Sequence, residues 1–449
     1  MRGRCRGRRR CERKGRGLGS LLFEDISVVD GAGALTEHAY VGVRDGRIDY
    51  VGGAAPQGAY DERYAGAGKV LMPGLYNAHS HVPMTLLRGR GENLPLDRWL
   101  NESIFPFEAL ISDEDAYWAT LLGIAEMARF GVVAFSDMYY HSDARAKAVL
   151  ESGIKCNLGH SVLCFDDSAY EDLPAAAVNR HLVEELHGAG DGRLLVDYNL
   201  HAEYTSTERV ARGLADAARE AHVRMQVHVS ETASEVEACK ERHGGLTPVA
   251  YLAECGLFDV PTTAAHCVWL EGDDAEILAD KGVYVATNPA SNAKLGSGIA
   301  DVAGLQRAGV TLCLGTDGVA SNNNHNMFQD LYLLALMQRA GDHTPFGLSA
   351  PELIGIATRN GALSQGREDC GDIKAGNRAD LIVLDADCPW MEPAGDVVNN
   401  LIYAAQGSDV VLTMVDGQVI YRDGAYPTID VERAISETRA ARAAIEAQL

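Results

Sequence analysis

The 449-residue sequence has no apolar run of about 18 residues, the length that a membrane-spanning helix requires. Its ten cysteines include no Cys-X-X-Cys pair, and several, such as Cys156 and Cys267, lie inside apolar segments. This pattern favours reduced core residues over a disulfide framework or a zinc ribbon. We therefore expect a cytoplasmic protein that does not contact a membrane.

Basic residues are scarce outside the N-terminus. The chain has 40 Lys and Arg against 63 Asp and Glu, but residues 1–16 hold nine of the basic residues and one acidic residue. The remainder, with 31 basic and 62 acidic residues, would repel the phosphates of a nucleic acid, so we expect no nucleic-acid partner. The basic segment lacks aromatic side chains and a signal peptide's apolar core, and we interpret residues 1–20 as a disordered leader.

Histidines and acidic residues recur at the ends of short apolar segments. His79 and His81 are two residues apart, so in an extended strand both rings face the same side. One such pair is weak evidence, but further apolar segments at residues 194–199, 223–227, 262–265 and 310–314 precede more candidates. These are His201, His228 with Glu231, His266 and Asp317.

Helix-like segments follow most of these strands, for example residues 208–221 and 234–243. Strands that alternate with helices indicate a parallel sheet with crossover helices. In a closed (β/α)8 barrel of the TIM type, every strand delivers its C-terminal end to the same mouth. The sequence therefore predicts an α/β barrel in which five separated segments converge.

The alternation starts only near Leu75 and stops near Gly371. Short β-strands are predicted on both sides of it, at residues 21–28, 39–43, 47–51, 379–385, 410–415 and 418–421, with a hairpin turn at Asp416-Gly417. We predict a catalytic barrel of residues 75–370. Residues 21–74 and 371–449 would form a small composite β-sandwich domain with a C-terminal helix.

His79, His81 and His228 would supply three neutral nitrogen ligands, and Asp317 an oxygen. This set suits a borderline divalent ion such as Zn²⁺, with Fe²⁺ or Mn²⁺ as alternatives, and leaves a place for a water molecule. The ion would acidify that water, and Asp317 is the natural acceptor for the proton that it loses.

Two further groups have expected roles in proton transfer. Glu231, three residues after His228, can face a substrate without binding the metal, which suits a general acid. His266 would hydrogen-bond the hydroxide. For His201 and His266, a purely structural role at a strand end stays an alternative.

With these residues placed, the chain resembles the amidohydrolase superfamily, and within it the branch of the 5'-methylthioadenosine/S-adenosylhomocysteine deaminases and the related triazine chlorohydrolases. The resemblance covers most of the chain from about Leu21 onward, and it implies the same barrel and composite sandwich. It rests on residues 73–81, 84–89, 94–100, 105–108, 201–205, 228–232, 288–298 and 315–318.

The resemblance also bears on the number of metal ions. Binuclear relatives bridge their ions with a carboxylated lysine or a glutamate near the end of the fourth strand, which we place at residues 155–163. The only lysine of that segment, Lys155, lies at its start. A single divalent ion is therefore preferred.

The substrate is expected from the same resemblance. In the family, a glutamate matching Glu108 binds ribose hydroxyls, a histidine matching His201 contacts the base, and Glu231 and Asp317 flank the exocyclic amine. Trp99, with Phe105 and Phe107, is a candidate wall for a flat ring.

Two departures from the family pattern affect this expectation. Glu203 stands where the family usually has proline, and His160 appears in place of an arginine that contacts the distal end of the substrate. Loss of the guanidinium would weaken capture of a homocysteine carboxylate. Methylthioadenosine, 5'-deoxyadenosine and adenosine are then at least as well favoured as S-adenosylhomocysteine.

We predict a homo-oligomeric aminohydrolase that deaminates an adenosine-type nucleoside to an inosine-type product and ammonia. One alternative is a deaminase or chlorohydrolase of another amino-heterocycle, of the guanine, pterin or triazine type. Glu108 argues against a triazine, which has no ribose. A non-catalytic scaffold on the same fold is a third alternative, but such a protein would be expected to have lost metal ligands.

Overall fold

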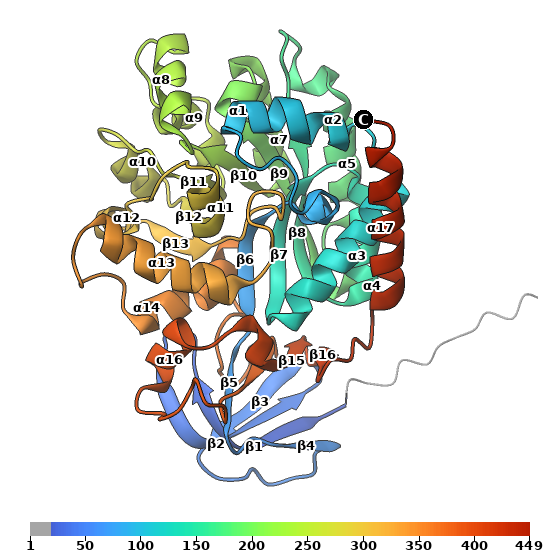
Figure 1. Cartoon of the computed structure of the whole chain (residues 1–449), viewed down its shortest axis with the longest axis vertical. Coiled ribbons are helices and arrows are strands. Elements are labelled where there is room, and N and C mark those ends of the chain that lie inside the picture. The colour runs from blue at the N-terminus through green and yellow to red at the C-terminus, as the bar shows by residue number, and fades with distance from the viewer. Residues whose placement is uncertain (1–18) are drawn as a thin grey trace, which may run out of the picture.

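The computed structural model describes residues 19–449, and its larger part is a barrel of eight parallel strands (Figure 1). The strands pair in chain order, and the backbone N–H of Asp317 donates to the carbonyl of His79 over 3.0 Å, which joins the last strand to the first. The predicted (β/α)8 barrel is confirmed. Its strands are β6 (Leu75–Ser80), β7 (Val132–Tyr139), β8 (Lys155–Val162), β9 (Leu194–Ala202), β10 (Arg224–Val229), β11 (Thr262–His266), β12 (Tyr284–Thr287) and β13 (Thr311–Leu314).

Helices surround the barrel, so its strands are covered on both faces and every residue of β7 is buried. Helix α7 shows how the sequence directs this packing: Thr207 caps its N-terminus, and its apolar residues recur every three or four positions on the buried face. The helices up to the end of the barrel are α1 (Leu96–Arg98), α2 (Phe105–Glu108), α3 (Asp113–Arg129), α4 (Ser142–Ser152), α5 (Pro174–Leu186), α6 (Ala189–Gly192), α7 (Glu208–Ala221), α8 (Ala233–Arg242), α9 (Pro248–Glu254), α10 (Asp274–Asp280), α11 (Pro289–Lys294), α12 (Val302–Ala308), α13 (Met327–Gly341), α14 (Ala350–Gly355) and α15 (Gly361–Ser364).

The strand that begins at Lys155 is the third of the barrel, because only β6 and β7 precede it. Its placement as the fourth strand is therefore wrong, and the fourth strand is β9, which carries His201. Lys155 lies at the opposite end of the barrel from the candidate ligands. Its ammonium is buried against Asp380 and, at 2.8 Å, Asp416, which belong to the segments beyond the barrel.

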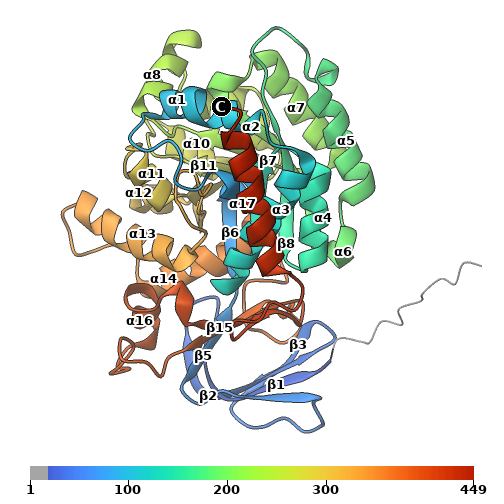
Figure 2. The same cartoon turned by 45° about the vertical axis from the view of Figure 1, so that its right-hand side comes forward.

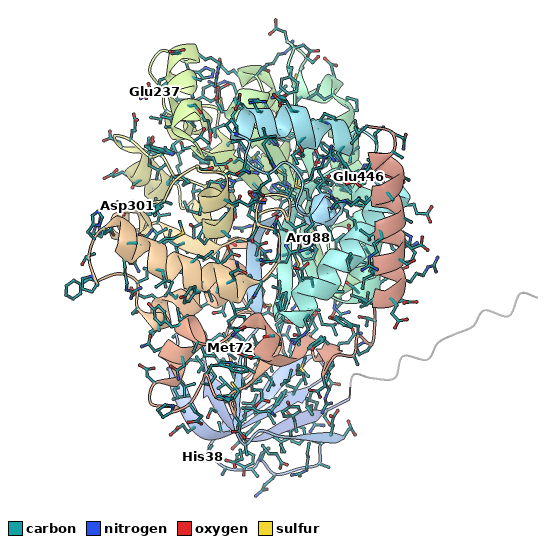
Figure 3. The ribbon with its side chains drawn as sticks, viewed as in Figure 1. His38, Met72, Arg88, Glu237, Asp301 and Glu446 are labelled. Atoms are coloured by element: carbon teal, nitrogen blue, oxygen red, sulfur yellow. The ribbon has the colours of Figure 1, made fainter. Side chains whose placement is uncertain are left out.

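The two ends of the chain join in one continuous sheet, in the order β16-β15-β14-β5-β1-β2-β3, with β4 paired to β1. On β5, Leu71 faces the core of this sheet, whereas its neighbour Met72 belongs to the barrel core, at the junction of the two parts (Figure 3). The strands are β1 (Leu21–Val29), β2 (Leu35–Arg44), β3 (Arg47–Gly52), β4 (Glu62–Ala65), β5 (Lys69–Pro73), β14 (Leu381–Asp385), β15 (Val410–Val415) and β16 (Gln418–Arg422). Helix α16 (Val397–Tyr403) lies between β14 and β15 in the chain.

The C-terminal helix α17 (Val431–Glu446) packs along α3 of the barrel (Figure 2). The Arg442 guanidinium donates to the Arg88 carbonyl over 2.7 Å, and Arg433 lies over the Trp118 ring. The sequence predicted a C-terminal helix here, and in the structure this helix lies against the barrel. Its apolar face indicated packing but could not indicate the partner.

The predicted basic leader lies outside the described residues except for its last two. Ser20 is already buried, and its backbone N–H donates to Asp61 over 2.7 Å. Within residues 19–449, no helix combines the length and the apolar character needed to span a membrane.

Candidate metal centre and active site

The four predicted ligands meet at the C-terminal ends of β6 and β10 and in the loop after β13. Oδ1 of Asp317 lies 3.2 Å from Nε2 of His81 and 3.6 Å from Nε2 of His79. Nε2 of His228 lies 3.2 Å from Nε2 of His81. Residues separated by more than 200 positions in the sequence therefore share one small centre.

The inner hydrogen bonds of the three rings fix their orientation. In each ring Nδ1 lies at an oxygen acceptor and donates to it, so the lone pair of Nε2 points at the shared centre. The acceptors are the Gln226 side chain for His79 (2.9 Å), the Met138 carbonyl for His81 and the His201 carbonyl for His228.

This donor set fits a divalent ion. Nε2 of His79 is fully buried and has no hydrogen-bond partner among residues 19–449, an unfavourable state that a bound cation would relieve. Three imidazole nitrogens and one carboxylate oxygen are the ligands that a borderline ion prefers.

Asp317 is held as a carboxylate by its neighbours. Its Oδ2 accepts from the Ser291 hydroxyl (2.6 Å) and the Ser321 hydroxyl (3.0 Å). Burial alone would raise the pKa of Asp317, but His79 and His81 outweigh burial and hold that pKa well below its usual range.

Glu231 and His266 lie beside the centre, with Oε2 of Glu231 3.9 Å from Nε2 of His266. Burial raises the pKa of Glu231, and the neighbouring Asp317 carboxylate raises it further. Nδ1 of His266 lies 2.8 Å from the Asn292 side-chain oxygen, and its ring lies within ligand distance of His79 and His228. Burial thus favours the protonated form of the Glu231 carboxyl.

A cavity opens over the centre. Trp99 and Phe105 line it, whereas Phe107 is buried in the neighbouring core and does not. The other lining residues are His81, Met84, Leu96, Leu100, Ile104, Glu108, Met138, Tyr139, Tyr140, Ser161, His201, Tyr204, His228, Glu231, His266, Leu295 and Asp317.

His160 does not line this cavity, although it was predicted to contact substrate. Side chains alternate along β8, and it is Ser161 that faces the cavity. The His160 ring lies instead at the Ser142 hydroxyl (3.2 Å), and burial, with Arg145 nearby, lowers the pKa of His160 to about 4. The alternation along β8 was the signal that could have identified Ser161.

Glu108 presents an unused acceptor to the cavity. Its Oε1 is shielded from solvent without a hydrogen-bond partner in the described chain, and so is the hydroxyl of Tyr139. Burial raises the pKa of Glu108 to about 7, although Tyr139 partly offsets this. Sequence reasoning missed Tyr139 because it did not identify β7.

Glu203 follows β9 closely, at the place where a bridging glutamate would stand. Its carboxylate is buried and turned away from the centre, accepting from Arg242 Nε (3.0 Å) and lying 2.7 Å from His243 Nε2. An arginine that already neutralises this carboxylate leaves it poorly suited to bridge two ions.

A closed parallel barrel with histidines and an aspartate at its C-terminal mouth defines a class, the barrel hydrolases that use a bound metal. The chain belongs to the amidohydrolase family, whose model matches residues 70–420. The predicted superfamily and its hydrolytic enzyme class are thereby confirmed.

Three known proteins are similar over nearly their whole length. A 5-methylthioadenosine/S-adenosylhomocysteine deaminase of Moorella thermoacetica is 39% identical over 424 residues, 94% of this chain and 98% of that protein. A 5'-deoxyadenosine deaminase of Methanothermobacter thermautotrophicus is 38% identical over 426 residues, 95% and 98% of the two chains. The crystal structure of an adenosine deaminase from Xanthomonas campestris with bound zinc has a TM-score of 0.88 and 30% identity, covering 95% and 98%.

Proposed function

We propose that the protein is a metal-dependent deaminase of an adenosine-type nucleoside. The candidate substrates are 5'-methylthioadenosine, S-adenosylhomocysteine, 5'-deoxyadenosine and adenosine, and the products are ammonia and an inosine-type nucleoside. The observation that carries the proposal is one cavity lined by His81, His228 and Asp317 of the centre, by Glu231 beside it, and by Glu108 with its unused acceptor. The names of the similar proteins support the nucleoside.

His79, His81, His228 and Asp317 would hold one divalent ion, most readily Zn²⁺, with Fe²⁺ or Mn²⁺ as alternatives. The ion would supply Lewis acidity that makes a water molecule nucleophilic near neutral pH. The residues at the end of β9 support one ion rather than two. Glu203 is the carboxylate that follows this strand, and its ion pair with Arg242 leaves it unsuited to bridge a second ion.

The chain's own residues would move the protons. Asp317 accepts a proton from the attacking water, and Glu231 donates one to the ring nitrogen beside the carbon under attack. His266 hydrogen-bonds the oxygen that adds to the ring. His201, which lines the same cavity, contacts the base.

The remaining contacts would select the nucleoside. Glu108 accepts hydrogen bonds from the two ribose hydroxyls, since one carboxylate spans a vicinal diol. Trp99 and Phe105 form a wall for the flat base. No lysine or arginine is among the cavity's lining residues in the described chain, which favours an uncharged 5' substituent over a homocysteine carboxylate.

We also propose residues 75–370 as the catalytic domain and the sheet built from both ends of the chain as a second domain. The protein is a homo-oligomer in this proposal, because two large apolar side chains lie about one turn apart on the outward face of α13. Its exposed Tyr332 and Leu336, 42% and 39% exposed, would otherwise face water. Light scattering should show that Leu336→Glu lowers the molar mass of the particle in solution. Leu35→Glu, which changes a similarly exposed leucine on β2, should leave that mass unchanged.

The test is an ammonia-release screen of the zinc-loaded protein with the four nucleosides, guanine and melamine. We expect activity on at least one nucleoside and its loss in Glu231→Gln, and a raised KM in Glu108→Ala. No ammonia release from any of the nucleosides at full zinc occupancy, or full activity of Glu231→Gln, would overturn the proposal. Activity on guanine or melamine alone would instead indicate a deaminase of another amino-heterocycle.

A further inference from the structure

The segment from Asn288 to Ser297 contacts three groups of the proposed reaction. The Ser291 hydroxyl donates to Asp317, and the Asn292 side-chain oxygen lies at Nδ1 of His266. The Ser297 hydroxyl donates to Oε1 of Glu231 over 2.9 Å. One short segment, α11 and the turn after it, therefore orients every predicted proton-handling side chain.

We propose that Ser297 is a positioning residue for Glu231, which rests on the proposed function. Its hydroxyl holds Oε1, so Oε2, on the side of His266, is the oxygen that delivers the proton. In that step the O–H bond at Oε2 breaks and an N–H bond forms on the substrate ring. The electron pair stays on the Glu231 carboxylate, where the Ser297 hydrogen bond stabilises it.

The backbone around Ser297 is built to fix this hydroxyl. Its N–H donates to the Asn292 carbonyl over 2.9 Å, and its carbonyl accepts from the Trp269 indole over 2.6 Å. Gly296 and Gly298, with φ of 72° and 131°, permit the sharp turn that presents the side chain. Ser297 is itself 3% exposed, so water does not compete for its hydroxyl.

The other side of Glu231 is also fixed, which leaves Ser297 as the partner that decides the rotation of the carboxylate. The Glu235 carboxylate accepts the backbone N–H groups of Glu231 (2.8 Å) and Ser230 (3.0 Å). In the described chain Glu231 has no other side-chain hydrogen bond. Removing the Ser297 hydroxyl should therefore release the carboxylate without moving the backbone.

The test compares Ser297→Ala, Ser297→Thr and the matched control Ser234→Ala, an exposed serine on α8. With the nucleoside that the wild type deaminates best, Ser297→Ala should lower kcat about tenfold, the effect of one charge-assisted hydrogen bond. KM should change less than twofold, and zinc content should not change. Ser297→Thr should restore most of kcat, and Ser234→Ala should match the wild type.

Two comparisons separate positioning from general damage. In the Glu231→Gln background, Ser297→Ala should cause no further loss, since the group that it positions is already absent. The proposal would be overturned by an unchanged kcat in Ser297→Ala, by a raised KM in place of a lowered kcat, or by a Ser297→Thr variant that does not recover kcat. It would also be overturned if Ser297→Ala lowered kcat equally in the Glu231→Gln background.

Crystal structures supply a readout that does not need activity. Glu231 should adopt one carboxylate orientation in the wild type and a rotated or multiple orientation in Ser297→Ala. The same orientation in both would overturn the role of Ser297, whatever the substrate. A wild type inactive on every nucleoside would instead contradict the proposed function alone.

Discussion

The Glu108→Gln variant is expected to make the protein more stable and less active. Glu108 has a buried oxygen without a partner, and burial raises its pKa from 4.5 to about 7. Between these two values the folded protein holds a proton that the unfolded chain has lost, so folding stability falls as pH rises from about 4.5 to about 7. Glutamine cannot ionise and avoids this cost.

The size of the effect follows from the pKa shift. A shift of about 2.5 units corresponds to roughly 3 kcal/mol of stability at pH 8, as an upper estimate. Urea denaturation of both proteins should therefore show little difference at pH 4.5 and a growing advantage of Glu108→Gln up to about pH 8. Glu102→Gln is the control, because Glu102 is exposed on the same segment and Arg98 lowers its pKa.

Activity should change in the opposite direction. Loss of the hydrogen bonds that the charged Glu108 carboxylate accepts from the ribose hydroxyls should raise KM by about tenfold or more. In the wild type, kcat/KM should fall as pH drops below about 7, because Glu108 then becomes protonated. A Glu108→Gln protein that gains no stability between pH 4.5 and 8, or that keeps the wild-type KM, would refute this reasoning.

Three other outcomes are expected. Glu231→Gln should lower kcat by at least about a hundredfold in the ammonia assay while zinc content stays the same, and loss of zinc would contradict its role. Gln226→Leu should lower zinc affinity about 10- to 100-fold in a metal-buffered titration, because His79 loses the acceptor that orients it; unchanged affinity would exclude that role. Ser161→Arg should raise kcat/KM for S-adenosylhomocysteine relative to 5'-methylthioadenosine, and an unchanged ratio would place the 5' substituent elsewhere.

The convergence of the candidate ligands could be predicted from the sequence because they lie at the ends of apolar strands or directly after them. In a barrel, that position alone sends His79, His228 and Asp317 to the same mouth. Spacing within a strand was also informative, since His79 and His81 share a face. The same rule, applied to β8, would have chosen Ser161 over His160.

Other features depend on tertiary contacts that no local pattern encodes. Strand β7 has no ligand candidate among those predicted, and the sequence pattern did not identify it. The packing of α17 on α3 joins segments more than 60 positions apart in the sequence. The hydrogen bond from Ser297 to Glu231 does the same. Such pairs become visible only when the fold brings them together.

The most direct test of the central claim is the metal content of the purified protein after zinc loading and removal of excess zinc. The account predicts about one zinc ion per chain, and less than about a tenth of that in His79→Ala and Asp317→Ala. Two ions per chain, or full zinc occupancy in either variant, would contradict a single centre held by these ligands.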